Sequence, residues 1–257
     1  MAEPIAGAFA KLERAQEHLT LLQRELLDFE ERNTEYVLAE EVHSESGRKV
    51  LRAQHIPQAP SHLGLVFSDV VHNLRSALDY AVYRPTRTGQ TQTAFPIYLV
   101  GKSKDKKKRT YAKVGIKLIE HLPAPAQKFI EFVQPYHRRS GRSQALLWRL
   151  QDLARAEKHH GVPFITRLGE RRGSEIYASG GQEIPERVDG GPMYFDEGGI
   201  AAVLWSPLYP EIRLKPRFVL KVFLPVRRQS WDWELGALAS GMYNHVTWIL
   251  VSLKGML

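Results

Sequence analysis

The residues best suited to chemistry lie in the segment HNLRSALDYAVY, residues 72–83. His72, Arg75 and Asp79 follow one another at i, i+3 and i+7, a spacing that brings side chains close together on a helix. An arginine beside a titratable histidine and a carboxylate can bind a phosphate group and transfer a proton. The segment therefore predicts an acid–base site that binds phosphate, and the same residues also suit a buried polar network.

A second segment, DLARAEKHH at residues 152–160, places another carboxylate and histidine on a predicted helix. Asp152 and His159 fall along one stripe of that helix, with Arg155 or Ala156 between them. The preceding loop, PYHRRSGR at residues 135–142, is basic and aromatic. We expect four catalytic residues: His72, Arg75, Asp79 and His159. We expect five phosphate-binding residues: Arg75, Lys158, Arg138, Arg139 and Arg142.

A metal site is a weaker interpretation of the same two helices. Its ligands would be two carboxylates and two histidines: Asp79, His72, Asp152 and His159. The chain has no compact ligand motif such as His-Glu-x-x-His, and Arg75 and Lys158 would repel a nearby cation. We therefore expect chemistry that uses neither a metal ion nor a cofactor.

These motifs resemble a widespread group of uncharacterised bacterial proteins. The resemblance rests on HNLRSALDYAVY, on TAFPIY at residues 93–98, on VQPYH at 133–137 and on LWRLQDLARAEKHH at 147–160. In that group the first helix typically reads His-Asn-Leu-Arg-Ser-Ala-Leu-Asp-His and the second ends in Asp-Lys-His-Arg. The matching residues are Arg75, Asp79, Lys158 and His159. The resemblance covers the chain to about residue 160. It implies a shared fold, but it does not imply any particular reaction.

The first motif is also similar to the Arg-x4–6-His signature of HEPN-domain ribonucleases, helical proteins in which arginine and histidine act on the phosphodiester without a metal. The chain departs from this signature at Tyr80, which stands where the histidine should be. Tyrosine is a poor base near neutral pH. The resemblance then implies that His72 or His159 transfers the proton, or that the chain is an inactive relative that keeps Arg75 for phosphate binding.

Composition predicts a folded protein that does not enter membranes. Hydrophobic residues make up 43% and charged residues 25%, which is ordinary globular usage. The chain has no cysteine, which excludes disulfides, thiolate metal sites and a cysteine nucleophile, and favours the cytoplasm. Its N-terminus carries charges where an export signal needs apolar residues, and the apolar stretch 242–253 is too short to span a bilayer. We expect a soluble, cytoplasmic protein with no membrane partner.

The net charge of +8 is distributed unevenly along the chain. Residues 1–50 carry 6 basic and 11 acidic side chains, whereas residues 101–150 carry 13 basic and 3 acidic ones. A regional excess of positive charge attracts phosphate backbones over long distances. RNA or another phosphate-bearing ligand is therefore the expected partner.

Helical periodicity predicts four longer helices. The first covers residues 6–32, and the second runs from a capping Ser61 to about Tyr83. In the second helix, Asn73 falls on the polar side. Its apolar face consists of Phe67, Val70, Val71, Leu74, Leu78 and Ala81. The remaining long helices are expected at about 143–160 and 231–253, with short ones near 113–120 and 125–133.

Strand patterns occur in two places. Residues 34–42 and 49–54 predict a hairpin with its turn at 44–47, and after Val162 short β-prone runs are separated by Gly and Pro. We expect an α+β fold, a helical bundle with a small antiparallel sheet packed on one side. We also expect a single integrated domain, 1–257. Its parts would be helical at 1–34, 61–160 and 229–257, a β-hairpin at 34–55, and β-rich at 162–228.

Two functions are consistent with these features. The first is RNA or nucleotide phosphate binding, extended to metal-independent RNA cleavage if Arg75 binds phosphate while His72 and His159 exchange protons. The alternative is a non-catalytic interaction protein, such as a homodimer joined through its helices, in which the same polar residues form a structural network. An open basic cleft favours the first function, and a sealed, paired network favours the second.

Overall fold

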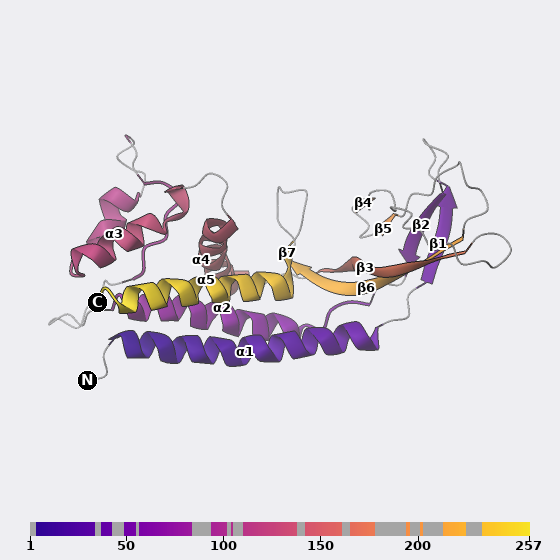
Figure 1. Cartoon of the computed structure of the whole chain (residues 1–257), viewed down its shortest axis with the longest axis horizontal. Helices are drawn as coiled ribbons and strands as arrows, with labels where there is room; N and C mark the ends of the chain where they lie inside the picture. The colour runs from indigo at the N-terminus through magenta and orange to yellow at the C-terminus, as the bar shows by residue number, and fades with distance from the viewer. Residues whose placement is uncertain are drawn as a thin grey trace. The chain divides into compact units, whose positions relative to one another are not determined.

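The chain consists of a helical and a β-rich set of elements, shown in a computed structural model (Figure 1). They form two compact units, residues 1–24, 61–163 and 235–257 in one and residues 25–60 and 164–234 in the other. The structure describes residues 4–33, 37–42, 49–54, 57–83, 94–101, 104, 110–137, 142–160, 165–177, 194–195, 201–202, 213–224 and 233–257. Side chains are described at 5–33, 57–83, 94–101, 104, 110–137, 146–156, 166, 221–224 and 233–257.

The unit boundaries lie close to the predicted borders between helical and β-rich parts. An α+β fold of helices with small antiparallel sheets is therefore confirmed. The packing of a sheet on one side of the bundle, and the folding of the chain as a single integrated domain, stay predictions.

Helices dominate the first unit, and the predicted long helices are confirmed to within a few residues. The α-helices are α1 (Pro4–Arg32), α2 (His62–Ala81), α3 (Ala124–Phe132), α4 (Arg142–His160) and α5 (Leu235–Lys254). Shorter turns are η1 (Tyr111–Gly115), η2 (Ile116–Leu118) and η3 (Pro135–His137). The predicted short helix near 113–120 is thus a π-helical turn followed by a 3₁₀ turn.

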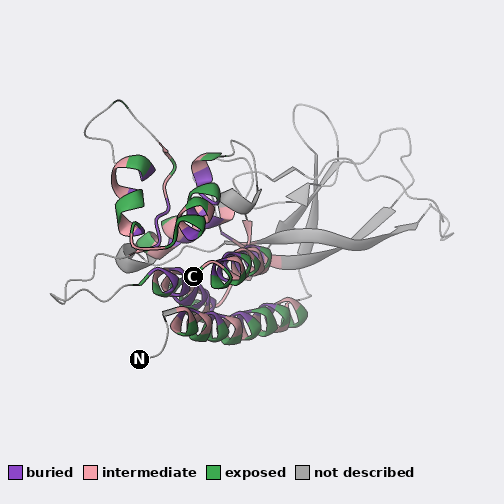
Figure 2. Cartoon of the chain, turned by 60° about the vertical axis from the view of Figure 1, so that its left-hand side comes forward, coloured by how far each residue is buried: buried purple, intermediate pink, exposed green. Residues whose placement is uncertain are grey.

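The helices of the first unit pack through their apolar faces. Figure 1 shows α1, α2 and α5 running alongside one another, and α2, α4 and α5 also contact each other in pairs. Gly7 allows α1 to approach α2, because a Cβ atom there would lie only 2.6 Å from the Tyr80 ring. The buried residues of these helices face inward in Figure 2, so the core of this unit is a helical one.

Helix α2 lies at the centre of this core, and its apolar face is buried as predicted. Each of the six residues expected there is at most 2% exposed. The prediction for Asn73 was wrong, since it is only 6% exposed and its Nδ2 donates to the Asp69 carbonyl at 2.9 Å. The capping role of Ser61 was also wrong, because its backbone is already helical and its side chain makes no cap hydrogen bond.

The second unit contains the strands. The predicted hairpin is confirmed as β1 (Val37–Val42) paired antiparallel with β2 (Lys49–Gln54), and its predicted turn lies outside the described residues. Strand β3 (Ile165–Tyr177) joins two predicted runs into one and pairs antiparallel with β6 (Arg213–Leu224). The register of that pair shifts on either side of Arg171, so the strand bends while it continues.

Short strands complete the β-rich unit. Tyr194–Phe195 (β4) pairs with Ala201–Ala202 (β5), and Trp233–Glu234 (β7) adds a third strand beside β6. Helix α5 begins only after β7, so the expectation that Trp233 belongs to the last helix was wrong. Within the described part of the chain, no helix combines the length and apolar character needed to cross a membrane.

Burial along α2 predicts a contrast between two leucines. Leu78 is completely buried, whereas Leu65 is 70% exposed. Leu78→Ala should lower the free energy of unfolding by about 2–5 kcal/mol, because it removes buried apolar contacts and leaves a cavity. Leu65→Ala should change it by less than about 0.5 kcal/mol. Urea denaturation measures both, and equal losses would contradict the assignment of the buried face.

Helix α5 contains a largely buried histidine, His245, whose ring stacks on Trp248 with 5.6 Å between ring centroids. Its Nε2 atom is buried without a hydrogen-bond partner among the described residues. Burial lowers the pKa of His245 to about 4, since the charged ring would lose its hydration. The folded unit therefore holds this histidine neutral.

Acidification should destabilise the fold through His245. Between about pH 6.5 and pH 4 the unfolded chain binds a proton that the folded chain does not, so stability falls across this window by up to about 3 kcal/mol. His245→Gln should flatten that part of the pH profile of the unfolding free energy. His72→Gln, at an exposed histidine of α2, is the control. An unchanged slope in His245→Gln would rule out this role.

Candidate functional site

The centre of the candidate site is an ion pair on α2. Arg75 Nη2 lies 2.8 Å from Asp79 Oδ1, one helical turn further along. The same Nη2 donates to the Phe95 carbonyl oxygen at 2.9 Å, and Asp79 Oδ1 accepts from the Phe95 backbone N–H at 2.8 Å. The pair therefore satisfies both backbone polar groups of Phe95 and attaches the segment 94–99 to α2.

The Gln134 side chain also binds the backbone of segment 94–99. Its Oε1 accepts from the Tyr98 N–H at 3.0 Å, and its Nε2 donates to the carbonyl oxygens of Pro96 at 2.7 Å and Ile130 at 2.9 Å. The Gln134 side chain is completely buried, so these bonds are shielded from water. The motifs TAFPIY and VQPYH, noted in the sequence, thus contact each other directly.

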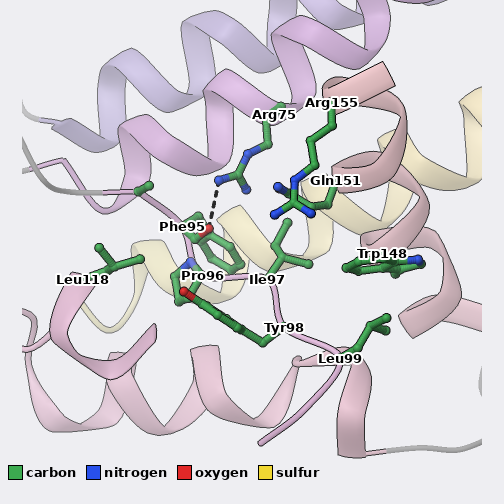
Figure 3. Close-up of a pocket in the computed structure, with 11 residues that line it drawn as sticks. Arg75, Phe95, Pro96, Ile97, Tyr98, Leu99, Leu118, Trp148, Gln151 and Arg155 are labelled. Carbon is green, nitrogen blue, oxygen red and sulfur yellow. Dashed lines mark hydrogen bonds between the residues drawn. The ribbon is translucent and has the colours of Figure 1, made fainter. Parts of the chain in front are cut away.

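A pocket of about 460 Å³ opens beside Arg75, a volume ordinary for a small-molecule site (Figure 3). Its walls come from α2, from segment 94–99, from η2 and from α4. In Figure 3 the guanidinium groups of Arg75 and Arg155 point toward the same space, with Gln151 beside them and Trp148 further along α4. The pocket therefore combines two cations with an aromatic wall.

Arg75 is held with one donor unused. Its side chain is 17% exposed, and Nη1 is buried without a hydrogen-bond partner among the described residues. Burial lowers the pKa of Arg75, the Asp79 carboxylate raises it, and the neighbouring Arg155 cation lowers it further. Arginine stays protonated in proteins, so the consequence is a poorly hydrated charge that an added anion would stabilise.

Arg155, on α4, is exposed and contacts the Gln151 amide. With the Gln151 oxygen turned toward Arg155, that oxygen accepts from Nε at 3.0 Å and from Nη2 at 3.3 Å. This amide orientation satisfies the hydrogen-bonding groups of both side chains. Gln151 then directs its own amide donors away from Arg155.

The residues predicted for catalysis have different surroundings. Arg75 and Asp79 form the ion pair. Arg75 lines the pocket, and Asp79 accepts from the backbone N–H of Phe95, another lining residue. His72 lies on α2 but is exposed and is absent from the pocket lining. His159 lies in α4, and its side chain is outside the described residues. The structure thus brings together two of the four residues.

Four of the five predicted phosphate-binding residues have side chains outside the described residues. Arg138 and Arg139 lie outside the described residues, and Arg142 and Lys158 are described only as backbone of α4. Arg75, the member of this set whose side chain is described, lines the pocket.

Three pocket residues on α4 were missed as site residues: Trp148, Gln151 and Arg155. They are spaced i, i+3 and i+7, the same steps that marked His72, Arg75 and Asp79 on α2. This repeated spacing of polar and aromatic residues is the sequence feature that could have identified them as site residues. The partner segment 94–99 has no helical or strand periodicity, so its approach to α2 had no signal beyond the motif itself.

The four-residue metal set is not assembled among the described side chains. Asp79 Oδ1 accepts from a cation and a backbone N–H, and the described residues include no cluster of three or more histidine or acidic side chains suited to a metal ion.

Comparisons of the chain with protein-family models, curated proteins and solved structures find no match.

The ion pair predicts a strong response to loss of Asp79. Asp79→Ala leaves the Arg75 charge and the Phe95 N–H without this acceptor, and should cost about 2–3 kcal/mol of unfolding free energy. This loss of unfolding free energy is smaller than that for breaking a fully buried ion pair, because the Asp79 side chain is 36% exposed.

Chemical denaturation of Asp79→Ala, of Arg75→Met and of the double variant measures this coupling. The double variant should lose less than the sum of the two single losses. Asp69→Ala is the matched control, since it removes a more exposed carboxylate of the same helix. A similar loss in Asp69→Ala and Asp79→Ala would contradict the bridging role.

Proposed function

We propose that the chain binds a phosphate-bearing ligand, RNA or a nucleotide, in the pocket between Arg75 and Arg155. The observation that carries this proposal is the largely buried Arg75, which lines the pocket and whose Nη1 has no partner among the described residues. A buried donor on a cation costs free energy unless an acceptor meets it, and a phosphate oxygen is a suitable acceptor.

The charges around the pocket favour an anion. Asp79 neutralises one arginine through Nη2, whereas Arg155 adds a second positive charge to the pocket lining. Arginine suits phosphate because its planar group can donate two parallel hydrogen bonds to two oxygens. The net charge of +8 would also attract a polyanion such as RNA from a distance.

Metal-independent cleavage extends this proposal and needs a proton carrier near the bound phosphate. His72 is exposed and absent from the pocket lining, so His159, on the same helix as Arg155, is the stronger candidate. Lys158, Arg138, Arg139 and Arg142 remain proposed phosphate-binding residues. Binding is therefore the primary function proposed, and cleavage is its extension.

A second function, that of a non-catalytic interaction protein, is supported by a different observation. The Arg75–Asp79 pair ties segment 94–99 to α2, which is what a structural network does. Large apolar side chains are also exposed in the helical unit, among them Trp248 at 45% and Phe132 at 55%. A homodimer joined through its helices would cover such residues.

Loss of one pocket arginine should weaken phosphate binding. Arg155→Gln should raise the dissociation constant for a 5′-phosphorylated, 3′-labelled single-stranded RNA by roughly tenfold or more, the effect of one charge-assisted hydrogen bond. Arg155 is exposed, so this variant should fold. Fluorescence anisotropy at fixed salt measures the binding. Arg14→Gln removes the same charge from an exposed ion pair on α1 and is the control.

Equal weakening in Arg155→Gln and Arg14→Gln would indicate only a general charge effect and contradict the pocket. No binding by the unaltered chain at moderate salt would favour the interaction protein. The same RNA incubated with and without chelator, in the unaltered chain and in His159→Ala, tests cleavage. Chelator-resistant products that His159→Ala does not form are the result expected from the extended proposal.

A further inference from the structure

Most of the pocket beyond the two arginines is apolar. The apolar side chains of the lining include Phe95 and Ile97 from segment 94–99, Leu118 from η2 and Trp148 from α4. A bare phosphate ion would contact the arginines and leave this apolar wall facing water. The wall therefore fits a ligand that has an apolar or aromatic body in addition to its charge.

Trp148 lies at a suitable separation from the charged end of the pocket. It precedes Arg155 by seven residues on α4, which places the two Cα atoms about 10 Å apart along the helix axis. Gln151 lies between them, and its amide donors point away from Arg155. The α4 face thus presents a cation, an amide and an aromatic ring in that order, as Figure 3 shows.

We propose that the pocket recognises a phosphate monoester that carries an aromatic ring, with the phosphate between the Arg75 and Arg155 side chains and the ring against Trp148. This inference rests on the proposed function and makes it specific. In RNA this unit is a single unpaired nucleotide at a phosphorylated end, and a free mononucleotide offers the same chemistry. A duplex keeps its bases stacked inside, so it cannot place a ring against this wall.

Two observations together carry the inference. Arg75 lines the pocket with a side chain that is only 17% exposed, so a phosphate reaches it by entering the pocket instead of lying across a surface. Trp148, the tryptophan among the described lining residues, stands at the other end of the pocket, where an aromatic ring of the ligand would stack. Stacking of a base on an aromatic side chain strengthens binding by roughly five- to 150-fold.

Four ligands separate the ring from the phosphate. Isothermal titration of the full chain with inorganic phosphate, ribose 5-phosphate, phenyl phosphate and adenosine 5′-monophosphate should rank the two ring-bearing ligands at least fivefold tighter than the other two. Trp148→Leu should remove that preference and keep the binding of inorganic phosphate. Trp248→Leu, at an exposed tryptophan of α5, should preserve the preference.

The outcomes of this titration distinguish recognition of the aromatic ring from the proposed phosphate binding on which it rests. Equal affinity for all four ligands in the unaltered chain would overturn the role of the ring and leave phosphate binding intact. No binding of any of the four would overturn this inference, and the anisotropy measurement with RNA would then decide separately whether phosphate binding stands. The ranking is measured on the unaltered chain, so it tests the inference even if Trp148→Leu fails to fold.

A second set of ligands identifies the source of the nucleotide. A 5′-phosphorylated single-stranded RNA, the same RNA without its phosphate, and the phosphorylated duplex are each competed against adenosine 5′-monophosphate. Displacement by the phosphorylated single strand indicates an RNA end, and its failure to displace indicates a free nucleotide; both agree with the inference. Displacement by the duplex as effective as that by the single strand would overturn it.

Discussion

The carboxylate oxygen Oδ1 of Asp79 accepts from two donors that are distant in sequence, the Arg75 guanidinium and the Phe95 N–H. The candidate site depends on this shared acceptor. It fixes the rotation of the Arg75 side chain and the path of segment 94–99 in one arrangement, so the wall of the pocket and its buried donor are positioned together. A ligand then meets a site whose polar groups are already oriented, which lowers the entropy lost on binding.

The amphipathic character of α2 was readable from the sequence because helical periodicity depends only on neighbours along the chain. Arg75 and Asp79 were identified for the same reason, since their i, i+4 spacing brings them together in any helix. Asn73 was misplaced because residue type was taken as a guide to exposure. A backbone carbonyl four residues earlier satisfies its amide, which makes burial tolerable.

Contacts between distant segments had no comparable signal. The approach of Phe95 to α2 is made by backbone groups, which every residue possesses, so side-chain patterns do not reveal it. On α4 the histidine attracted attention because it titrates, whereas Arg155 and Trp148 line the pocket. In the β-rich unit, the glycines of β3 suggested interruptions, yet the strand continues through shifts of register.

The hydrogen bonds from Gln134 to the backbone of segment 94–99 affect how the pocket can change over evolutionary time. Gln134 and the Arg75–Asp79 pair both recognise the backbone of segment 94–99, and neither bonds to its side chains. Because peptide groups are the same at every position, substitutions at Ala94, Ile97 or Leu99 leave these bonds available. The segment can therefore acquire new side chains, and with them new ligand preferences, while its course past the two arginines is inherited unchanged.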